Sequence, residues 1–133
     1  MKVFLDTNVL VSAFATRGLS ADLLELVLVE HELITGRRVL DELEKALRGK
    51  LKLPAARSAE LRSFVSAEAV RVVQTESEAA CRADAEDRRL LGEALAGEAD
   101  VFVTGDAALV ALQKVGAMQV LTPRQFWEML RAS

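Results

Sequence analysis

A chain of 133 residues, 51% of them hydrophobic, is long enough to bury the core of one domain, which we expect to span residues 1–133. With 17 basic and 20 acidic side chains the net charge is −3, so the chain lacks the overall positive charge that neutralises phosphates in many nucleic-acid-binding proteins. The single cysteine and single histidine, Cys81 and His31, exclude an intrachain disulfide, a cysteine-built zinc site and a relay of two histidines. Any catalysis would therefore depend on carboxylates.

We expect neither a membrane-spanning segment nor a signal peptide in this chain. The longest apolar stretch, at residues 23–29, is interrupted by Glu25, so we expect no membrane association. The first residues lack the charged and apolar regions of a signal peptide, and the expected location is the cytoplasm.

Predicted strands and helices alternate along the chain. Apolar runs bounded by polar residues predict strands at residues 2–5, 33–35, 70–73, 100–104 and 118–121. Helical periodicity and capping residues predict helices at 8–15, 21–30, 37–48, 54–66, 76–82, 84–96, 106–114 and from 123 onward. Such alternation is typical of right-handed crossovers. We therefore expect an α/β fold of three layers, with a mostly parallel central sheet of four or five strands flanked by helices on both faces.

Acidic residues follow the strands at the edge where α/β proteins bind ligands. Asp6 ends the first predicted strand and Asp106 follows the fourth, so both would reach the carboxyl edge of the sheet. Asp87 lies in the first turn of the helix that leads into the fourth strand. Two of these acids have structural explanations, because Asp84 and Asp87 resemble a capping box and Asp106 could cap the helix that it begins. Asp6 is harder to explain, because an acid at the end of a buried strand is costly without partners.

The predicted helix at residues 37–48 adds three more acids. Its apolar stripe is centred near Leu43, which leaves Asp41 on the far side and places Glu42 and Glu44 on either flank of the stripe. A flanking carboxylate can reach over the edge of the sheet or remain in solvent beside an arginine. Periodicity does not distinguish Glu42 from Glu44.

Five segments in one order cover nearly the whole chain. They are Phe-Leu-Asp-Thr-Asn-Val-Leu at 4–10 with Ser-Ala at 12–13, Leu-Asp-Glu-Leu-Glu at 40–44, Cys-Arg at 81–82 with Glu-Asp at 86–87, Ala-Asp-Val-Phe-Val-Thr-Gly-Asp at 99–106, and Val-Leu-Thr-Pro-Arg-Gln-Phe at 120–126. The segment at 99–106 is the most specific of these. Together they resemble the PIN domain, the small nuclease fold of VapC-type toxins and related ribonucleases. The resemblance implies a PIN-like version of the expected fold.

The resemblance also implies which residues form a site. The acidic quartet of the family falls on Asp6, Glu42, Asp87 and Asp106, which would be both the catalytic residues and the metal ligands, with Glu44 and Glu86 as further candidates. Asn8 and Thr104 match supporting polar positions. The chain departs from the family at Ala83-Asp84, where Asp-Pro is common, and at Ala108, where many members have another acid.

Four converging acids require a compensating charge. Two carboxylates about 5 Å apart at an effective dielectric near 20 repel each other by roughly 3 kcal/mol. Oxygen ligands suit Mg²⁺ or Mn²⁺ rather than zinc, and one or two such ions could hold a phosphate oxygen and lower the pKa of a bound water. We therefore expect metal-dependent hydrolysis of RNA phosphodiesters. The preference for single-stranded RNA over DNA is implied by the resemblance alone.

The resemblance further implies a toxin of a type II toxin-antitoxin system, with an antitoxin as partner and a homodimer as assembly. Arg82, Arg88 and Arg89 flank the expected site and could contact RNA phosphates, or could form an ordinary solvated helix face. Three alternatives remain: an RNA-processing nuclease without a toxin role, a non-catalytic module that binds metal or RNA, and a phospho-accepting receiver domain. The receiver domain would need an acid after a middle strand and a lysine after a late one, where the chain has Gln74-Thr75 and Thr122-Pro123.

Overall fold

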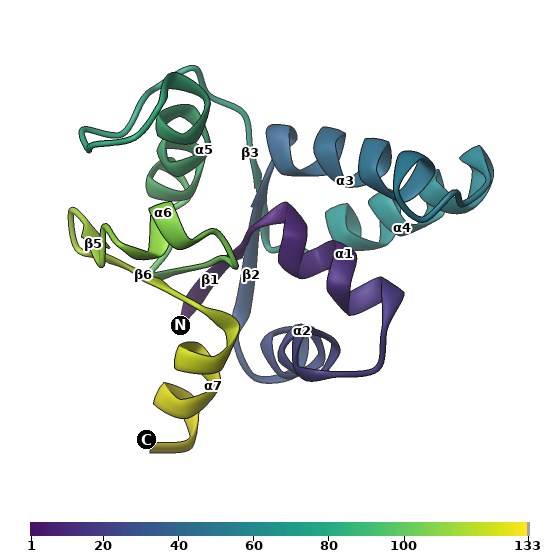
Figure 1. Cartoon of the computed structure of the whole chain (residues 1–133), viewed down its shortest axis with the longest axis horizontal. Helices are drawn as coiled ribbons and strands as arrows, with labels where there is room; N and C mark the ends of the chain where they lie inside the picture. Colours follow the sequence, from purple (N-terminus) through teal and green to yellow (C-terminus); the bar gives the residue numbers. More distant parts are fainter. Residues whose placement is uncertain (133) are drawn as a thin grey trace.

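The computed structural model describes residues 1–132 and shows an α/β fold (Figure 1). In this part of the chain the sheet has six strands: β1 (Lys2–Leu5), β2 (Glu32–Gly36), β3 (Arg71–Val73), β4 (Val101–Val103), β5 (Lys114–Val115) and β6 (Met118–Leu121). The seven helices described there are α1 (Thr7–Ala15), α2 (Leu19–Glu30), α3 (Arg37–Gly49), α4 (Ala55–Glu68), α5 (Ala85–Ala96), α6 (Ala107–Val110) and α7 (Pro123–Ala132). None of these seven is long and apolar enough to cross a membrane.

The strand order of the sheet is β3-β2-β1-β4-β6-β5. All neighbouring strands are parallel except β5 and β6, which form an antiparallel pair. The strand order reverses at β1, which lies between β2 and β4 at the centre of the sheet. The crevice at the carboxyl ends of β1 and β4 is therefore the place where an open α/β sheet binds ligands.

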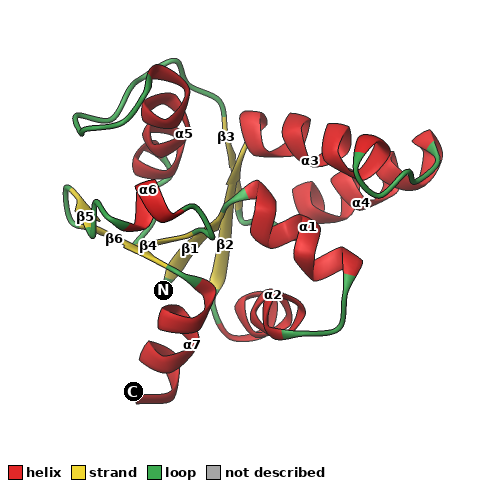
Figure 2. Ribbon diagram, viewed as in Figure 1, coloured by secondary structure: helices red, strands yellow, loops and turns green. Residues whose placement is uncertain are grey.

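Helices cover both faces of the sheet, as the sequence predicts. In the view of Figures 1 and 2, α1 to α4 lie to the right of strands β1 to β3, whereas α5 and α6 lie to the left. Helix α7 packs against α2 and β6. The result is the three-layer arrangement expected for alternating strands and helices.

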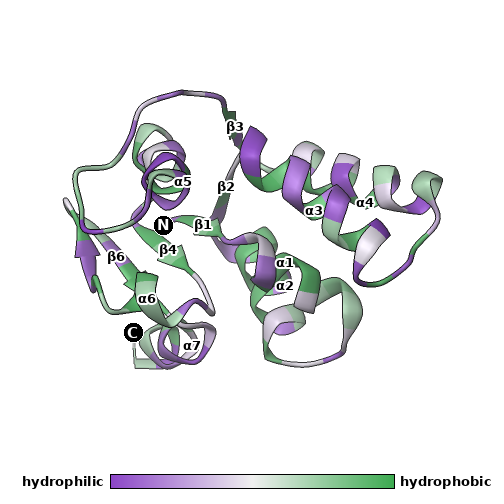
Figure 3. Cartoon of the chain, turned by 45° about the horizontal axis from the view of Figure 1, so that its top comes forward, coloured by the Kyte–Doolittle hydropathy of each residue, from purple (hydrophilic) through white to green (hydrophobic). Residues whose placement is uncertain are grey.

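The core lies between the central strands and the inner faces of the helices. Phe4 of β1 and Phe102 of β4 are fully buried, and their rings stack with centroids 5.4 Å apart. Figure 3 shows hydrophobic residues on β1 and β4 and hydrophilic residues along the outer side of α3. Because the central strands are buried on both faces, they have continuous apolar sequences rather than alternating ones.

One predicted helix is absent and another is shorter than predicted. Residues 76–82 form no helix, because their backbone packs on α5 instead: Ala79 N donates to the carbonyl of Arg88 at 2.8 Å, and the carbonyl of Ser77 lies where a Cβ on Gly92 would be. The helix predicted for 106–114 ends after Val110. Gln113 and Gly116 then adopt φ values of 62° and 61°, which turn the chain into the β5–β6 hairpin. The sheet consequently has six strands, whereas four or five are expected from the sequence.

The other predicted elements are present, with ends shifted by at most two residues. The strand-to-helix junctions that carry the candidate acids are among these elements.

Candidate functional site

Asp6 lies where β1 passes into α1. It is 6% exposed and serves as the N-cap of α1: Thr7 N donates to its Oδ1 at 2.7 Å. Such capping satisfies one of the backbone N–H groups that a helix start leaves without a partner. The second oxygen, Oδ2, accepts hydrogen bonds from Thr104 Oγ1 at 2.7 Å and from Asn8 Nδ2 at 3.4 Å. Both carboxylate oxygens are therefore held in place.

Strand register brings Thr104 to Asp6. Leu5 of β1 pairs with Val103 of β4, so the residue after each strand, Asp6 and Thr104, lie side by side at the carboxyl edge. Thr104 is fully buried, and its hydroxyl also accepts a hydrogen bond from Asp106 N at 3.0 Å. One hydroxyl thus connects two of the expected acids. Asn8 supports the same edge, because its Oδ1 accepts from Gly105 N at 3.2 Å.

The environment of Asp6 disfavours its charged form. Burial raises the pKa of Asp6, and the hydrogen bonds from Thr104 and Thr7 oppose that effect. The nearby charges of Glu42 and Asp106 raise the pKa of Asp6 further. Two of the other three expected acids are therefore close enough to repel this carboxylate.

The structure separates Glu42 from Glu44. Glu42 Oε2 accepts a hydrogen bond from Thr7 Oγ1 at 3.2 Å, and Glu42 lines the same pocket as Asp6. Glu44 lies on the opposite flank of α3, where it pairs with Arg62 of α4 at 3.2 Å. Asp41 pairs with the same Arg62 at 2.7 Å. Of these three acids, only Glu42 lies at the candidate site.

Asp87 enters the pocket from α5. Burial raises the pKa of Asp87, and the charges of Asp84, Asp106, Glu86 and Glu42 raise it further. Asp84 caps α5, because its carboxylate accepts a hydrogen bond from Asp87 N at 2.9 Å. This capping uses only the backbone of Asp87, and the Asp87 side chain lines the pocket.

Asp106 combines the two roles that the sequence leaves open. Its Oδ1 caps α6 by accepting from Ala108 N at 2.8 Å and from Leu109 N at 3.3 Å. Its carboxylate also lines the pocket, and its charge contributes to the raised pKa values of Asp6 and Asp87.

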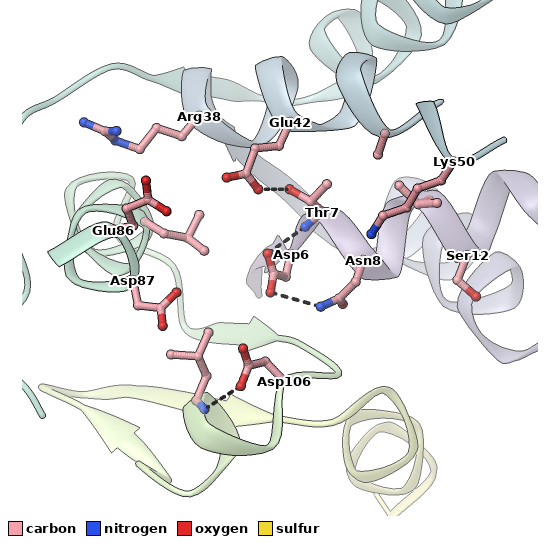
Figure 4. A pocket seen from close by; sticks show the side chains of 14 residues that line it. Asp6, Thr7, Asn8, Ser12, Arg38, Glu42, Lys50, Glu86, Asp87 and Asp106 are labelled. Carbon is pink, nitrogen blue, oxygen red and sulfur yellow. Dashed lines mark hydrogen bonds between the residues drawn. The ribbon is translucent and has the colours of Figure 1, made fainter. Parts of the chain in front are cut away.

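The four acids therefore face one pocket of about 470 Å³. Figure 4 shows Asp6 at the end of β1 between Glu42 on one side and Asp106 on the other, with Asp87 pointing in from α5. Glu86, the further acid of α5, lines the pocket as well.

The positive side chains at this pocket are not the expected ones. Arg38 and Lys50, near the two ends of α3, line it, whereas Arg82, Arg88 and Arg89 do not. Arg88 pairs instead with Glu78 at 3.0 Å. The sequence analysis did not assign Arg38, Lys50 or Thr7 to the site, although Arg38 and Lys50 lie near the ends of α3 and Thr7 directly follows Asp6.

The four acids offer the oxygen ligands that a hard divalent cation prefers. Within residues 1–132, no three His, Cys, Asp or Glu side chains form a group that could hold a metal ion as they stand. The acids face one another across the pocket, all with oxygen donors, and the charges of Glu42 and Asp106 raise the pKa values of Asp6 and Asp87. A cation such as Mg²⁺ or Mn²⁺ would relieve that repulsion. Asp6, Glu42, Asp87 and Asp106 are the residues that would hold it.

Comparison with known proteins agrees with this architecture. The structure is similar to a chain in the crystal structure of VapBC2 from Rickettsia felis bound to a DNA fragment from their promoter. The TM-score is 0.64 at 14% sequence identity, and the similarity covers 92% of this chain and 98% of the other. At that identity the similarity concerns the fold. No curated protein matches the sequence. The family model of the PIN domain matches residues 2–108, and the chain therefore belongs to the PIN-domain family.

Proposed function

We propose that this protein is a metal-dependent ribonuclease that hydrolyses phosphodiester bonds of RNA. PIN domains are generally nucleases, and membership in that family supports a hydrolase. The observation that carries the proposal is the setting of Asp6, a buried carboxylate whose pKa is raised by burial and by the acids that face it. A buried acid that other acids face is costly unless it serves a charged ligand.

In this proposal Asp6 has a different role from the other three acids. Asp6 is the central ligand, because Thr7, Asn8 and Thr104 fix its two oxygens. Glu42, Asp87 and Asp106 complete the ligand set and orient water toward the scissile phosphate. One or two bound Mg²⁺ or Mn²⁺ ions would supply Lewis-acid stabilisation of phosphate oxygens and a water of lowered pKa.

Positive side chains at the pocket suit a polyanionic substrate. Arg38 lies near the start of α3 and Lys50 just after its end, on either side of Glu42. Side chains placed in this way can hold the phosphates that flank the bond to be cleaved, which reconciles the net charge of −3 with a nucleic-acid substrate. The choice of single-stranded RNA over DNA rests on the resemblance to the VapC-type ribonucleases.

We also propose that the protein is the toxin of a toxin-antitoxin pair and forms a homodimer. One similar solved structure is a VapBC2 complex with promoter DNA, which supports an antitoxin as partner. An apolar groove supports a protein interface: Val29 and Phe64 are 76% and 43% exposed and line it together with Phe14, Leu24 and Leu28.

Cleavage by the purified protein tests the enzymatic proposal. The protein is stripped of metal with a chelator, and single-stranded RNA and DNA of the same sequence are incubated with added Mg²⁺ or Mn²⁺. We expect cleavage of RNA that requires the metal and is abolished by Asp6→Asn. Asp22→Asn changes an exposed acid of α2 that does not line the pocket; it is the matched control and should cleave like the wild type. Equal cleavage by the Asp6 variant would exclude the assignment.

Expression in a bacterial host tests the toxin role and separates the alternatives. Growth arrest by wild type and not by Asp6→Asn supports a toxin that acts as a nuclease. Cleavage in vitro without growth arrest favours an RNA-processing nuclease. Metal or RNA binding without cleavage favours a non-catalytic module. The receiver-domain alternative is removed by the family match.

A further inference from the structure

Glu93 is an acid that the proposed chemistry does not use, although it is only 1% exposed. It belongs to α5, six residues after Asp87, and its carboxylate reaches the start of α3. There Arg38 N donates to Glu93 Oε1 at 3.3 Å and to Oε2 at 3.4 Å. A side chain from a different helix thus accepts from a backbone N–H in the first turn of α3.

The sequence at the start of α3 leaves room for this carboxylate. The N-cap residue is Gly36, which has no side chain to cap the helix. A Cβ at Gly36 would lie 2.2 Å from Glu93 Oε1, closer than atoms can approach. The glycine and the glutamate are therefore complementary: the space that Gly36 leaves empty is occupied by the carboxylate that replaces the missing cap.

The contact joins the two helices that carry facing ligands. Glu42 follows Arg38 by four residues, so the two residues share one face of α3, and both line the pocket. Asp87 and Glu93 lie on α5, and at about 1.5 Å per residue they are separated by roughly 9 Å along the helix axis. A fixed Glu93–Arg38 contact therefore restricts how Glu42 moves relative to Asp87.

Burial of the Glu93 carboxyl group lowers the stability of the fold, so stability does not explain why an acid lies here. Burial raises the pKa of Glu93 to about 7, and the hydrogen bond and charge of Arg38 only partly oppose it. The charges of Asp41 and Glu76 raise the pKa further. An apolar side chain of similar size would remove that cost, because replacing buried ionic groups with packed apolar ones is often neutral or stabilising. Buried polar contacts can instead fix one arrangement of the elements that they join.

We propose that Glu93 is a positioning residue that caps α3 from α5 and thereby sets the spacing between Glu42 and Asp87. The expected effect on catalysis rests on the proposed function. The expected effect on the spacing of the helices rests only on the Gly36–Glu93–Arg38 contact.

Three variants separate positioning from simple stability. Glu93→Gln retains an acceptor oxygen at the same place, whereas Glu93→Leu removes it and keeps a buried apolar side chain. Gly36→Ala displaces the carboxylate from the other side of the contact, at a backbone φ of −138° that alanine adopts readily. We expect Glu93→Leu and Gly36→Ala each to lower kcat about tenfold or more with little change in KM, since small misplacements of reacting groups cost about that much. Glu93→Gln should retain most of the rate.

The double variant is a further check. Because both substitutions break one contact, Glu93→Leu combined with Gly36→Ala should be no slower than Glu93→Leu alone, whereas independent effects would multiply.

A distance measurement tests the structural part without any cleavage. Spin labels are attached at Arg48→Cys on α3 and Ala96→Cys on α5, two exposed positions, after Cys81→Ser removes the native thiol. The label-to-label distance distribution should broaden or shift in Glu93→Leu and in Gly36→Ala and remain as in wild type in Glu93→Gln. An unchanged distribution in both of the first two variants overturns the proposal. In active enzyme, an unchanged kcat in Glu93→Leu overturns it as well. Lack of cleavage by wild type would refute the nuclease assignment, but the distance measurement would still test the role of Glu93.

Discussion

The hydroxyl of Thr104 donates a 2.7 Å hydrogen bond to Oδ2 of Asp6 and accepts one from Asp106 N at 3.0 Å. This buried hydroxyl couples the end of β1 to the loop after β4, and so holds two acids of the pocket in one arrangement. Hydrogen bonds to charged groups are shorter and stronger than those between neutral groups. Thr104 is therefore a supporting residue whose removal should affect both folding and metal binding.

Thr104→Val tests this coupling, because valine has nearly the shape of threonine without the hydroxyl. We expect the free energy of unfolding to fall by about 1–3 kcal/mol in urea denaturation, since Asp6 and Asp106 N each lose a buried partner. Affinity for Mn²⁺ should fall about tenfold or more, as for other groups that orient metal ligands. Thr104→Ser is the control, because it keeps the hydroxyl, and it should retain the stability and the Mn²⁺ affinity of wild type. A Val variant that binds Mn²⁺ like wild type would contradict the supporting role.

Asp6→Asn should melt at a higher temperature than wild type in a chelating buffer at neutral pH. The folded-state pKa of Asp6 is raised above its ordinary value, so its ionised form destabilises the fold as the pH rises above about 4. Asparagine removes that charge. Added Mg²⁺ should then stabilise wild type according to its affinity and leave the variant unchanged. Equal Mg²⁺-induced shifts in calorimetry would show that the ion binds elsewhere.

Glu42→Gln and Glu44→Gln form a matched pair on one helix. Glu42 faces Asp6 across the pocket, whereas Glu44 pairs with Arg62. We expect Glu42→Gln to lower metal-dependent cleavage by about a hundredfold or more, because the ion that Glu42 helps to hold would stabilise the charge that develops in the transition state. Glu44→Gln should keep full activity and lose at most about 1 kcal/mol of stability, because its ion pair is partly exposed. A comparable loss of activity in both variants would contradict the assignment of Glu42, and not Glu44, to the site.

Glu93 should make the stability of the protein depend on pH between about 4.5 and 7. Its folded-state pKa is raised from 4.5 to about 7, so the folded protein binds a proton more tightly than the unfolded chain in this range. Stability is therefore greatest at the acid end and falls as pH rises, by up to about 1.4 kcal/mol per pH unit. Arg38, Asp41 and Glu76 face Glu93 in wild type and in Glu93→Gln alike. The difference in unfolding free energy between the two proteins should change across this window and be constant outside it. Parallel curves would contradict the shifted pKa.

Lys50→Ala should weaken RNA binding without abolishing cleavage of bound RNA. If Lys50 contacts one phosphate, its removal should reduce the dependence of log affinity on log salt by about 0.7 for a single strand. Lys45→Ala is the control, because Lys45 lies on α3, five residues before Lys50, and does not line the site. Arg89→Ala tests the expectation drawn from sequence and should have a smaller effect than Lys50→Ala. Binding measured by fluorescence anisotropy at several salt concentrations distinguishes these results.

Local sequence determines the strand-to-helix junctions. The apolar run before Asp6 and the Val-Phe-Val-Thr-Gly-Asp segment each fix a strand and the acid or hydroxyl that follows it, because strand propensity and capping depend on adjacent residues. The α/β class and the mostly parallel sheet follow from the alternation of such segments, and the structure agrees with both. Family membership is shown by the match to residues 2–108.

Tertiary structure decides the relationships between residues far apart in the chain. Which flank of α3 faces the pocket depends on where α4 packs, so periodicity could not distinguish Glu42 from Glu44. Packing of the 77–79 backbone on α5 prevents the expected helix at 76–82, and the pairing with β6 ends α6 early. Glu93 reaches Arg38 across 55 positions in the sequence, a contact that no local pattern encodes. Sequence alone determined that Asp6 stands at the end of its strand. The packing of α3, α5 and β4 around Asp6 determined which groups share its pocket, because the distances between these groups depend on contacts between segments far apart in the chain.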